Sequence, residues 1–284
     1  MDGQSVVDID SELAGWRQGD VILSDTLSSI HLADLARPGT PEASHLGKPG
    51  DEGLAVVAID IPGLVILTQT CDIVRSCIER PYLEVCPLIE LPEAEIALVR
   101  RSRRPQFTAL PGLGETGLVA DLDRVFTIEK VALAAFASDR VRGLETGDQV
   151  RDFADAIARK RSRVALPDDF VALAEPLQAR VKDKHSRNSD EGAFLRAARE
   201  IRVRATPNWD AEEIELEMLF VFDSIGEIPN GATGRVEALA QRVQLSGRFK
   251  ELSARAVGLD QISAATYLES DRLDLEHLSK PSNR

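Results

Sequence analysis

The sequence Gly63-Leu-Val-Ile-Leu-Thr-Gln-Thr-Cys-Asp72 is the most apolar run in the first half of the chain. Its apolar residues do not alternate with polar ones, which is typical of a strand that is buried on both faces. The run ends in four polar or reactive side chains, Gln69, Thr70, Cys71 and Asp72. Because a buried strand holds its own tip in place, we predict a functional site at the end of this strand.

Two arginines, Arg75 and Arg80, follow this tip in the sequence. Together with Thr70, Cys71 and Asp72 they form the predicted catalytic set. A carboxylate such as Asp72 can move a proton, and an arginine can stabilise negative charge that develops on a phosphate. The alternative for Asp72 is that it only caps the turn after the strand.

The thiol of Cys71 is an alternative nucleophile. It would need a nearby base, and His31 and His45 are the candidates. The other two cysteines, Cys77 and Cys86, do not form the Cys-x2–4-Cys pair that structural zinc sites usually carry. We therefore predict no metal and no cofactor. An odd number of cysteines without a secretory signal is typical of reduced thiols in the cytoplasm.

The composition supports a folded core, since the 284-residue chain has 43% hydrophobic residues. Its net charge of −13 argues against a general nucleic-acid binder. The sequence does not open with a basic, apolar leader, and the uncharged run over 61–71 is shorter than the roughly 20 residues that a membrane helix needs. We expect an intracellular, cytoplasmic protein that does not enter the membrane.

Charge is distributed unevenly along the chain. Residues 1–97 hold 17 acidic and 5 basic side chains, residues 98–204 hold 16 and 21, and residues 205–284 hold 14 and 8. A basic third of this kind can mark a surface that contacts phosphates, unless the acidic thirds neutralise it. The predicted nucleic-acid-binding cations form three clusters: Arg100, Arg101, Arg103 and Arg104; Arg159, Lys160, Arg161 and Arg163; and Lys182, Lys184, His185 and Arg187.

Short apolar runs with turn residues between them predict a small β barrel or sandwich over about residues 15–130. Strands are expected near 19–23, 54–60, 63–69, 82–88, 106–110 and 118–128. The Ile61-Pro62 pair is a plausible tight turn that joins the second and third of these strands as a hairpin.

Beyond residue 129 the apolar spacing changes to that of amphipathic helices, expected over about 148–163, 166–187 and 189–198. The period falls to two over 201–205 and 214–220, which predicts an antiparallel pair with Arg facing Glu on its outer face. A helix, a strand near 248–259 and a last helix follow. The predicted class is α+β, with a small β-barrel domain in residues 1–135, followed by a helical segment and a small α+β region in residues 136–284.

Two further motifs favour structural interpretations. Gly112-Leu-Gly-Glu-Thr-Gly117 matches the pattern of dinucleotide-binding loops, but a strand pattern follows it where that motif needs a helix, so a hairpin loop is favoured. Asp121-Leu-Asp123 could hold a divalent cation, but two carboxylates on one strand are more often a solvated face.

The segment Gln18-Gly-Asp-Val-Ile-Leu23, with the barrel-like strands after it, resembles the PemK/MazF-type toxin barrels over about residues 15–130. That family consists of small bacterial endoribonucleases and relatives with other roles. Its Arg-Pro pair has a loose counterpart in Arg80-Pro81. The second half resembles an uncharacterised bacterial family, in segments such as Arg159–Arg163 and Ser270–Asp274, and this resemblance implies no function.

The first hypothesis is a nucleic-acid-associated protein of bacterial defence or toxin–antitoxin type, with RNA or DNA as its partner and a ribonuclease-like barrel. If it cleaves RNA, Arg80 would stabilise the phosphorane and Asp72 or a histidine would move the proton. The alternative is a non-catalytic adaptor or regulatory subunit, whose acidic first third binds a basic protein partner. The sequence does not decide whether the protein is an enzyme.

Overall fold

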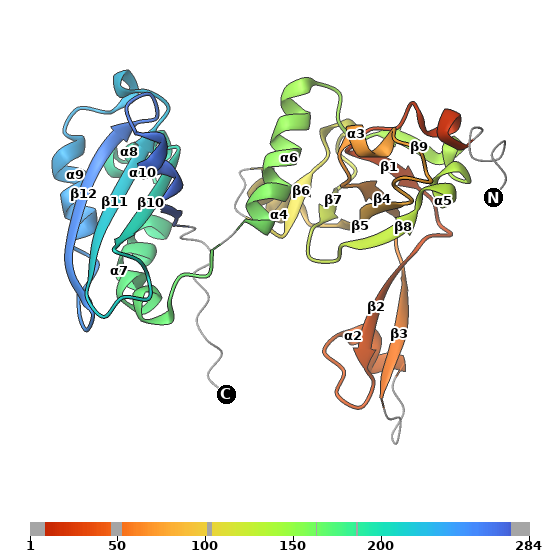
Figure 1. Ribbon diagram of the computed structural model, residues 1–284, viewed down its shortest axis with the longest axis horizontal. Coiled ribbons are helices and arrows are strands. Elements are labelled where there is room, and N and C mark those ends of the chain that lie inside the picture. The colour runs from red at the N-terminus through yellow and green to blue at the C-terminus, as the bar shows by residue number, and fades with distance from the viewer. Residues whose placement is uncertain (1–8, 47–52, 101–103, 163, 186, 274–284) are drawn as a thin grey trace. The chain divides into compact units, whose positions relative to one another are not determined.

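The computed structural model describes residues 9–46, 53–100, 104–162, 164–185 and 187–273, which form mixed α+β structure (Figure 1). The chain divides into two compact units, unit 1 (Met1–Ser162) and unit 2 (Arg163–Arg284). The domain boundary predicted from the sequence falls after residue 135. Helix α6 (Gly147–Arg161) belongs to unit 1, because its Phe153 is buried in a core cluster with Val21 and Val65.

Unit 1 is built on one curled antiparallel sheet, with the strand order β6-β7-β5-β4-β1-β9 and β8 paired to β5. The start of the decisive apolar run forms β4, which lies between β1 and β5, and all four of its residues are buried, as predicted. The strands are β1 (Asp20–Leu23), β4 (Gly63–Ile66), β5 (Tyr82–Glu90), β6 (Phe107–Ala109), β7 (Leu118–Asp121), β8 (Phe126–Glu129) and β9 (Arg140–Arg142).

Both faces of this sheet are covered by apolar side chains. Ile22 and Leu64 belong to one core cluster with Trp16, whereas their sequence neighbours Val21 and Val65 belong to a second cluster. Because successive side chains of a strand point to opposite faces, both faces of the central strands need apolar residues. This two-sided burial explains why the run shows no polar alternation.

The sheet is a half-barrel and does not close into the predicted barrel. In the described part of the chain its edge strands β6 and β9 do not pair with each other, and between them lies the turn η1 (Pro111–Leu113), where Gly112 N donates to Gly143 O at 2.9 Å. A ladder does not continue there, because Pro111 has no N–H to donate. The backbones also approach so closely that a Cβ on Gly112 would lie 2.1 Å from Arg142 O.

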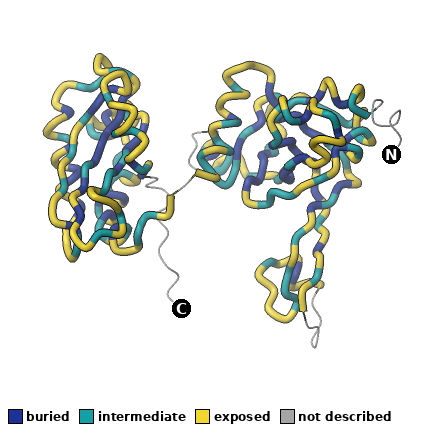
Figure 2. Tube along the Cα trace, viewed as in Figure 1, coloured by how far each residue is buried: buried dark blue, intermediate teal, exposed yellow. Residues whose placement is uncertain are grey.

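A two-stranded ribbon extends from the sheet of unit 1, and we call it, with its helix, the arm (Figure 1). It consists of β2 (Ser28–Asp34), β3 (Leu54–Asp60) and α2 (Pro41–Leu46). In the described part of the chain, β2 and β3 pair only with each other. Much of the arm is exposed, in contrast to the central strands of the sheet (Figure 2).

The predicted hairpin between 54–60 and 63–69 is wrong, since β3 pairs with β2 and β4 pairs with β1 and β5. The physical reason lies at the base of the arm. Ile61 N donates to Leu27 O at 3.0 Å, and both side chains are buried in one core cluster of unit 1. The chain therefore leaves the arm at Ile61 and enters the sheet at Gly63, without a turn between two paired strands.

Unit 2 is a four-stranded sheet in the order β12-β11-β10-β13, with helices packed on one face (Figure 1). The predicted antiparallel pair is confirmed: β10 and β11 align Arg204 with Glu217, and their side chains form an ion pair of 3.1 Å. Strand β12 runs parallel to β11. The strands of this sheet are β10 (Glu200–Thr206), β11 (Ile214–Phe222), β12 (Phe249–Gly258) and β13 (Asp271–Arg272).

Three helices of unit 2, α7, α8 and α9, enclose one continuous apolar core against the sheet. Phe170 from α7 and Phe194 from α8 pack in it with Phe220 of β11. Helix α7 runs through Pro176 as one element, so the proline does not divide it. The helices of unit 2 are α7 (Asp168–His185), α8 (Asp190–Ala197), η3 (Ile225–Glu227), α9 (Ala232–Ala240) and α10 (Ala264–Leu268); the remaining ones of unit 1 are α3 (Thr70–Ile73), α4 (Glu93–Arg100), α5 (Lys130–Ala134) and η2 (Ala137–Asp139).

Candidate functional site

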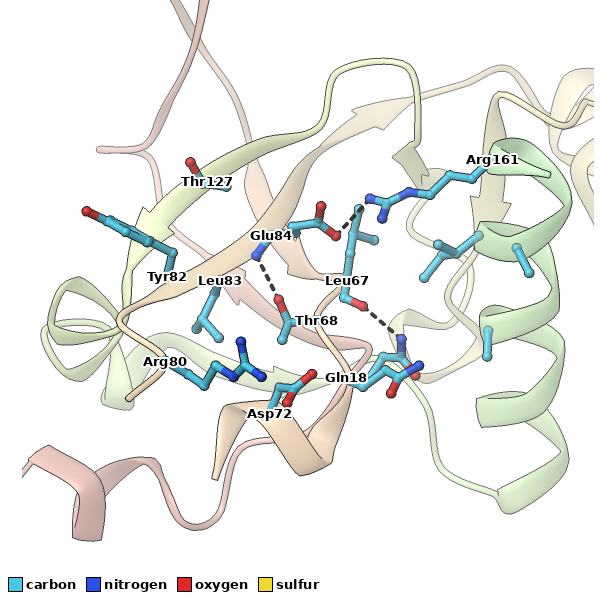
Figure 3. Close-up of a pocket in the computed structure, with 14 residues that line it drawn as sticks. Gln18, Leu67, Thr68, Asp72, Arg80, Tyr82, Leu83, Glu84, Thr127 and Arg161 are labelled. Atoms are coloured by element: carbon cyan, nitrogen blue, oxygen red, sulfur yellow. Dashed lines mark hydrogen bonds and ion pairs between the residues drawn. The ribbon is translucent and has the colours of Figure 1, made fainter. Parts of the chain in front are cut away.

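A pocket of about 520 Å³ lies in unit 1, beside the tip of the decisive apolar run (Figure 3). Strand β5 contributes Tyr82 and Glu84, and Thr127 of β8 lies opposite Glu84 in the ladder. Helix α6 lines it with small and apolar side chains and with Arg161 near its last turn. The short helix α3 lines it with Asp72. The pocket is therefore polar where strand and turn meet, and apolar along α6.

Backbone hydrogen bonds fix the chain as it leaves β4. Leu67 N donates to Glu84 O at 2.9 Å, and Glu84 N donates to the Thr68 hydroxyl at 2.7 Å. From the other side, Gln18 Nε2 donates to Leu67 O at 2.7 Å, and Gln18 N donates to the Thr70 hydroxyl at 3.1 Å. The hydroxyls of Thr68 and Thr70 thus position the turn that carries Asp72, and Figure 3 shows the contact of Thr68 with Glu84.

A buried lysine, Lys130, binds the backbone of the turn that carries Asp72. The side chain of Lys130 is fully buried, and its Nζ donates to Asp72 O and to Arg75 O, at 2.7 Å each. Its own N donates to Pro81 O at 2.8 Å. Burial lowers the pKa of Lys130, while the carboxylate of Asp10 acts in the opposite direction. One residue of α5 therefore ties down both ends of the segment from Asp72 to Pro81.

The charges that line the pocket are only partly paired. Arg161 Nη2 lies 2.8 Å from Glu84 Oε2. The Asp72 carboxylate lies 3.8 Å from Arg75 Nε, which is a loose pair between two half-exposed side chains. The guanidinium of Arg80 forms no ion pair or hydrogen bond with any residue that the structure describes. Arg80 is thus the cation of the pocket that is available to an anionic ligand.

The structure brings two of the five predicted catalytic residues to the pocket, Asp72 and Arg80. The other three do not line it. Thr70 accepts the hydrogen bond from Gln18 N, and Arg75 supports Asp72 from outside. Cys71 is exposed, and its Sγ lies 3.7 Å from Gln69 Oε1.

The bases considered for Cys71 belong to the arm, His31 in β2 and His45 in α2, and neither lines the pocket. The two remaining thiols are buried. Burial raises the pKa of Cys77, and a hydrogen bond to the nearby carboxylate of Asp10 acts in the same direction. Burial also raises the pKa of Cys86. These thiols therefore hold their protons more strongly than an ordinary cysteine does.

Sequence reasoning missed Tyr82, Glu84, Thr127 and Lys130. The first two were detectable in part, because an alternating strand over 82–88 puts Tyr82 and Glu84 on one face. Thr127 and Lys130 carry no local signal, since their roles depend on contacts with segments more than 40 residues away in the sequence.

Among the described residues, at least five of the twelve predicted nucleic-acid-binding cations form ion pairs within their own unit. A paired cation attracts an outside anion less, because its neighbour's charge opposes the approach. The alternative considered from the sequence, that the acidic thirds neutralise the basic third, applies to two of these pairs, which use Glu84 and Glu95. The others use Asp123 and Asp183 of the basic third itself. The pairs join Arg104 to Glu95, Lys160 to Asp123, Arg161 to Glu84, and both Lys184 and Arg187 to Asp183.

The remaining predicted cations are divided between the two units or lie outside the described residues. Arg100 and Lys182 are exposed, and neither has an ion pair with another described residue. They belong to different units, Arg100 to unit 1 and Lys182 to unit 2. Arg159 and His185 each interact within the chain, and Arg101, Arg103 and Arg163 lie outside the described residues.

Unit 2 has a smaller pocket of about 380 Å³, lined by Trp209, Arg204 and two carboxylates. Its charged groups and its indole N–H already have partners within unit 2. Trp209 Nε1 donates to Asp271 Oδ2 at 2.6 Å, and Arg204 pairs with Glu217 at 3.1 Å and with Glu269 at 3.4 Å. It therefore offers less to a ligand than the pocket of unit 1.

Comparison of the chain with protein-family models, curated proteins and solved structures gives no match. The resemblance to PemK/MazF-type barrels stays a prediction. Within the described residues, no group of three or more His, Cys, Asp or Glu side chains is arranged to hold a metal ion. No helix in that part of the chain combines the length and apolarity that crossing a membrane requires.

Proposed function

We propose that this protein binds single-stranded RNA at the pocket of unit 1. The observation that supports the proposal is Arg80, an arginine without a described ion pair, which lines the same pocket as the 63%-exposed ring of Tyr82. The guanidinium would hold a phosphate, and the ring would stack on a base. Single strands are favoured over duplexes because only unstacked bases expose their faces to an aromatic side chain.

Asp72 supports a preference for RNA over DNA. An ionised carboxylate can only accept hydrogen bonds, and the 2′-hydroxyl of RNA is a donor that DNA lacks. If Asp72 also removes that proton, the 2′-oxygen attacks the adjacent phosphorus and Arg80 stabilises the phosphorane. The bond from phosphorus to the 5′-oxygen then breaks, and the leaving 5′-oxygen takes a proton from water. The products would carry a 2′,3′-cyclic phosphate and a 5′-hydroxyl.

The number of unpaired cations that line the pocket sets the expected salt dependence of binding there. One unpaired arginine neutralises about one phosphate, so the plot of log K against log salt concentration should have a slope of about −0.7 for a single strand. A surface built from all the predicted basic clusters would give a slope several times steeper. A shallow dependence of log K on log salt concentration would therefore indicate binding at the pocket, as opposed to binding by the basic clusters.

The test uses a fluorescently labelled RNA oligonucleotide, its DNA counterpart and the full-length protein, with affinity measured by anisotropy. Tyr82→Ala should lower RNA affinity about tenfold, since one base stack contributes about 1–3 kcal/mol. Arg80→Ala should lower affinity and flatten the salt dependence.

Arg100→Ala is the matched control, because it removes the same charge from a helix end that does not line the pocket. Its affinity for RNA should be that of the unaltered protein. Equal losses in Arg80→Ala and Arg100→Ala, or no RNA binding at low salt, would contradict the proposal.

A further inference from the structure

The ribbon of the arm has two unlike faces. Val57 of β3 and Ser29 of β2 are buried, and Ala43 of α2 is fully buried on the helix that packs on the ribbon. The other face carries Ile30 and Leu32 of β2, which lie opposite Ala58 and Val56 of β3 in the antiparallel register, and Leu54 at its far end. We call this second face the arm face.

The arm face is apolar and open. Its large side chains are exposed by 53% at Ile30, 69% at Leu32, 77% at Leu54 and 66% at Val56. An isolated two-stranded ribbon gains little from such residues unless something covers them, and exposed apolar strands promote aggregation. A contiguous apolar patch of this kind is characteristic of a surface that binds another molecule.

Carboxylates bound the arm face at both ends. The row nearest the sheet pairs Ser28 with Asp60, and the row at the far end pairs Asp34 with Leu54. The carboxylate of Asp60 has one described partner, the Ser28 hydroxyl at 3.1 Å. Asp34 pairs with Arg37, whose side chain is 88% exposed. Along the strand the two acidic rows are about 20 Å apart, at about 3.4 Å per residue.

We propose that the arm face docks a protein partner that presents apolar side chains between two basic ones, about 20 Å apart. The apolar centre of the partner covers Ile30, Leu32 and Val56, and its lysines or arginines meet Asp34 and Asp60. This inference goes beyond RNA binding at the pocket, and none of the residues of the arm face lines that pocket.

Charge excludes a second copy of this chain as the favoured occupant. Two arm faces packed in antiparallel orientation would place Asp34 of each copy over Asp60 of the other. Packed in parallel, each carboxylate would meet its own counterpart. Like charges repel in both arrangements, and the stretch of sequence that contains the arm, residues 1–97, holds 17 acidic against 5 basic side chains. A basic partner is attracted by the same negative charges.

The test measures binding of two synthetic amphipathic peptides to the full chain by isothermal titration calorimetry. Each has a leucine stripe over about 14 helical residues, which spans about 20 Å, and the first has lysines at both ends where the second has glutamates. The lysine-flanked peptide should bind, and the glutamate-flanked peptide should bind at least tenfold more weakly.

Leu32→Thr with Val56→Thr should lower affinity for the lysine-flanked peptide about tenfold or more, because truncating central apolar contacts costs the most. Threonine keeps the strand preference of the ribbon. Ile78→Thr is the matched control, since Ile78 is 72% exposed in unit 1 but lies outside the arm. Asp60→Lys should reverse the preference between the two peptides. Fluorescence of Trp16, in the core at the base of the arm, checks that each variant folds.

Three results would overturn the inference: equal affinity for both peptides, no effect of the double threonine variant, or the same effect from Ile78→Thr. Sedimentation that shows a dimer lost only in the double variant would also overturn it, in favour of a second copy. RNA affinity should be unchanged in all the arm variants. The proposal for the arm face can therefore be contradicted without affecting the proposal of RNA binding at the pocket. Conversely, an unchanged RNA affinity in Arg80→Ala would contradict RNA binding at the pocket without affecting the proposal for the arm face.

Discussion

The two units use buried polar groups in different ways. In unit 1 the side chains of Asp20 and Lys130 are buried, and each holds backbone near the pocket: Asp20 accepts from Arg17 N at 2.8 Å, and Lys130 holds the turn after β4. In unit 2 the helix-covered core is apolar. Its buried carboxylate, Glu200, lies on the other face of the sheet and accepts from the Tyr267 hydroxyl.

This difference indicates where a buried polar group serves to hold backbone in position more than to stabilise the fold. Burying a charge contributes little net stability, because desolvation offsets the attraction of its partners. What buried, hydrogen-bonded ions do well is to hold loops in one conformation. Unit 1 places one such group, Lys130, against the carbonyls of the segment that carries Asp72 and Arg80, whereas the helix-covered core of unit 2 relies on packing. This difference supports the proposal that unit 1 carries the binding function.

The largest expected effect comes from the core of unit 2. Phe220 is fully buried, and its ring centroid lies 5.9 Å from that of Phe194. Phe220→Ala should destabilise unit 2 by about 3–5 kcal/mol, through lost apolar burial and the cavity it leaves. The chain has two tryptophans, one in each unit, so Trp16→Phe leaves Trp209 as the reporter of unit 2 in denaturant unfolding.

The same experiment with Trp209→Phe leaves Trp16 to report on unit 1. We expect no shift of the unit 1 transition in Phe220→Ala. Equal shifts of both transitions would show that the two units unfold as one. The stabilities of unit 1 and unit 2 could then not be compared separately.

A smaller effect is expected at the centre of the sheet of unit 1. A Cβ on Gly63 would lie 2.4 Å from Ile22 O, which is backbone of the neighbouring strand β1. Gly63→Ala should therefore force β1 and β4 apart and destabilise unit 1 by up to about 3 kcal/mol. Unfolding followed by Trp16 fluorescence should show it. Gly234→Ala, where a Cβ meets nothing within 4 Å, should be harmless.

Lys130→Met should cost less stability but should weaken binding. The variant leaves the carbonyls of Asp72 and Arg75 without a donor, and it also removes a buried charge, so the net loss should be about 1–2 kcal/mol. The loss in binding free energy for RNA should exceed the loss in the free energy of unfolding, because the turn that carries Asp72 is no longer held in place. Unchanged RNA affinity in a folded Lys130→Met variant would mean that this lysine is only structural.

The smallest effect concerns pH and unit 2. The hydrogen bond from Arg248 is the main cause of the lowered pKa of Asp169, whose ordinary value is 3.8. A lowered pKa means that the folded carboxylate stabilises unit 2 above pH 3.8, and that this contribution is lost as the pH falls below it. Since the pair is half exposed, the contribution should be less than about 1 kcal/mol. Asp169→Asn should lose less stability between pH 5 and pH 3, as reported by Trp209.

Local patterns predicted much of the architecture. The unbroken apolar run became the buried strand β4, and the period-two pattern over 201–205 and 214–220 became the pair β10–β11, with Arg204 opposite Glu217. These predictions hold because burial and alternation are properties of neighbouring residues. The position of Asp72 and Arg80 beside one pocket was also within reach, because both follow the same strand closely.

The sequence by itself determined which segments are buried, which alternate and which class the fold belongs to. Only the tertiary structure decided that β3 pairs with β2, that the sheet stays open, and that Lys160 and Arg161 are neutralised by Asp123 and Glu84. The physical reason is range. Strand partners and ion pairs join segments far apart in the chain, and their choice depends on the whole packing arrangement, which no local pattern encodes.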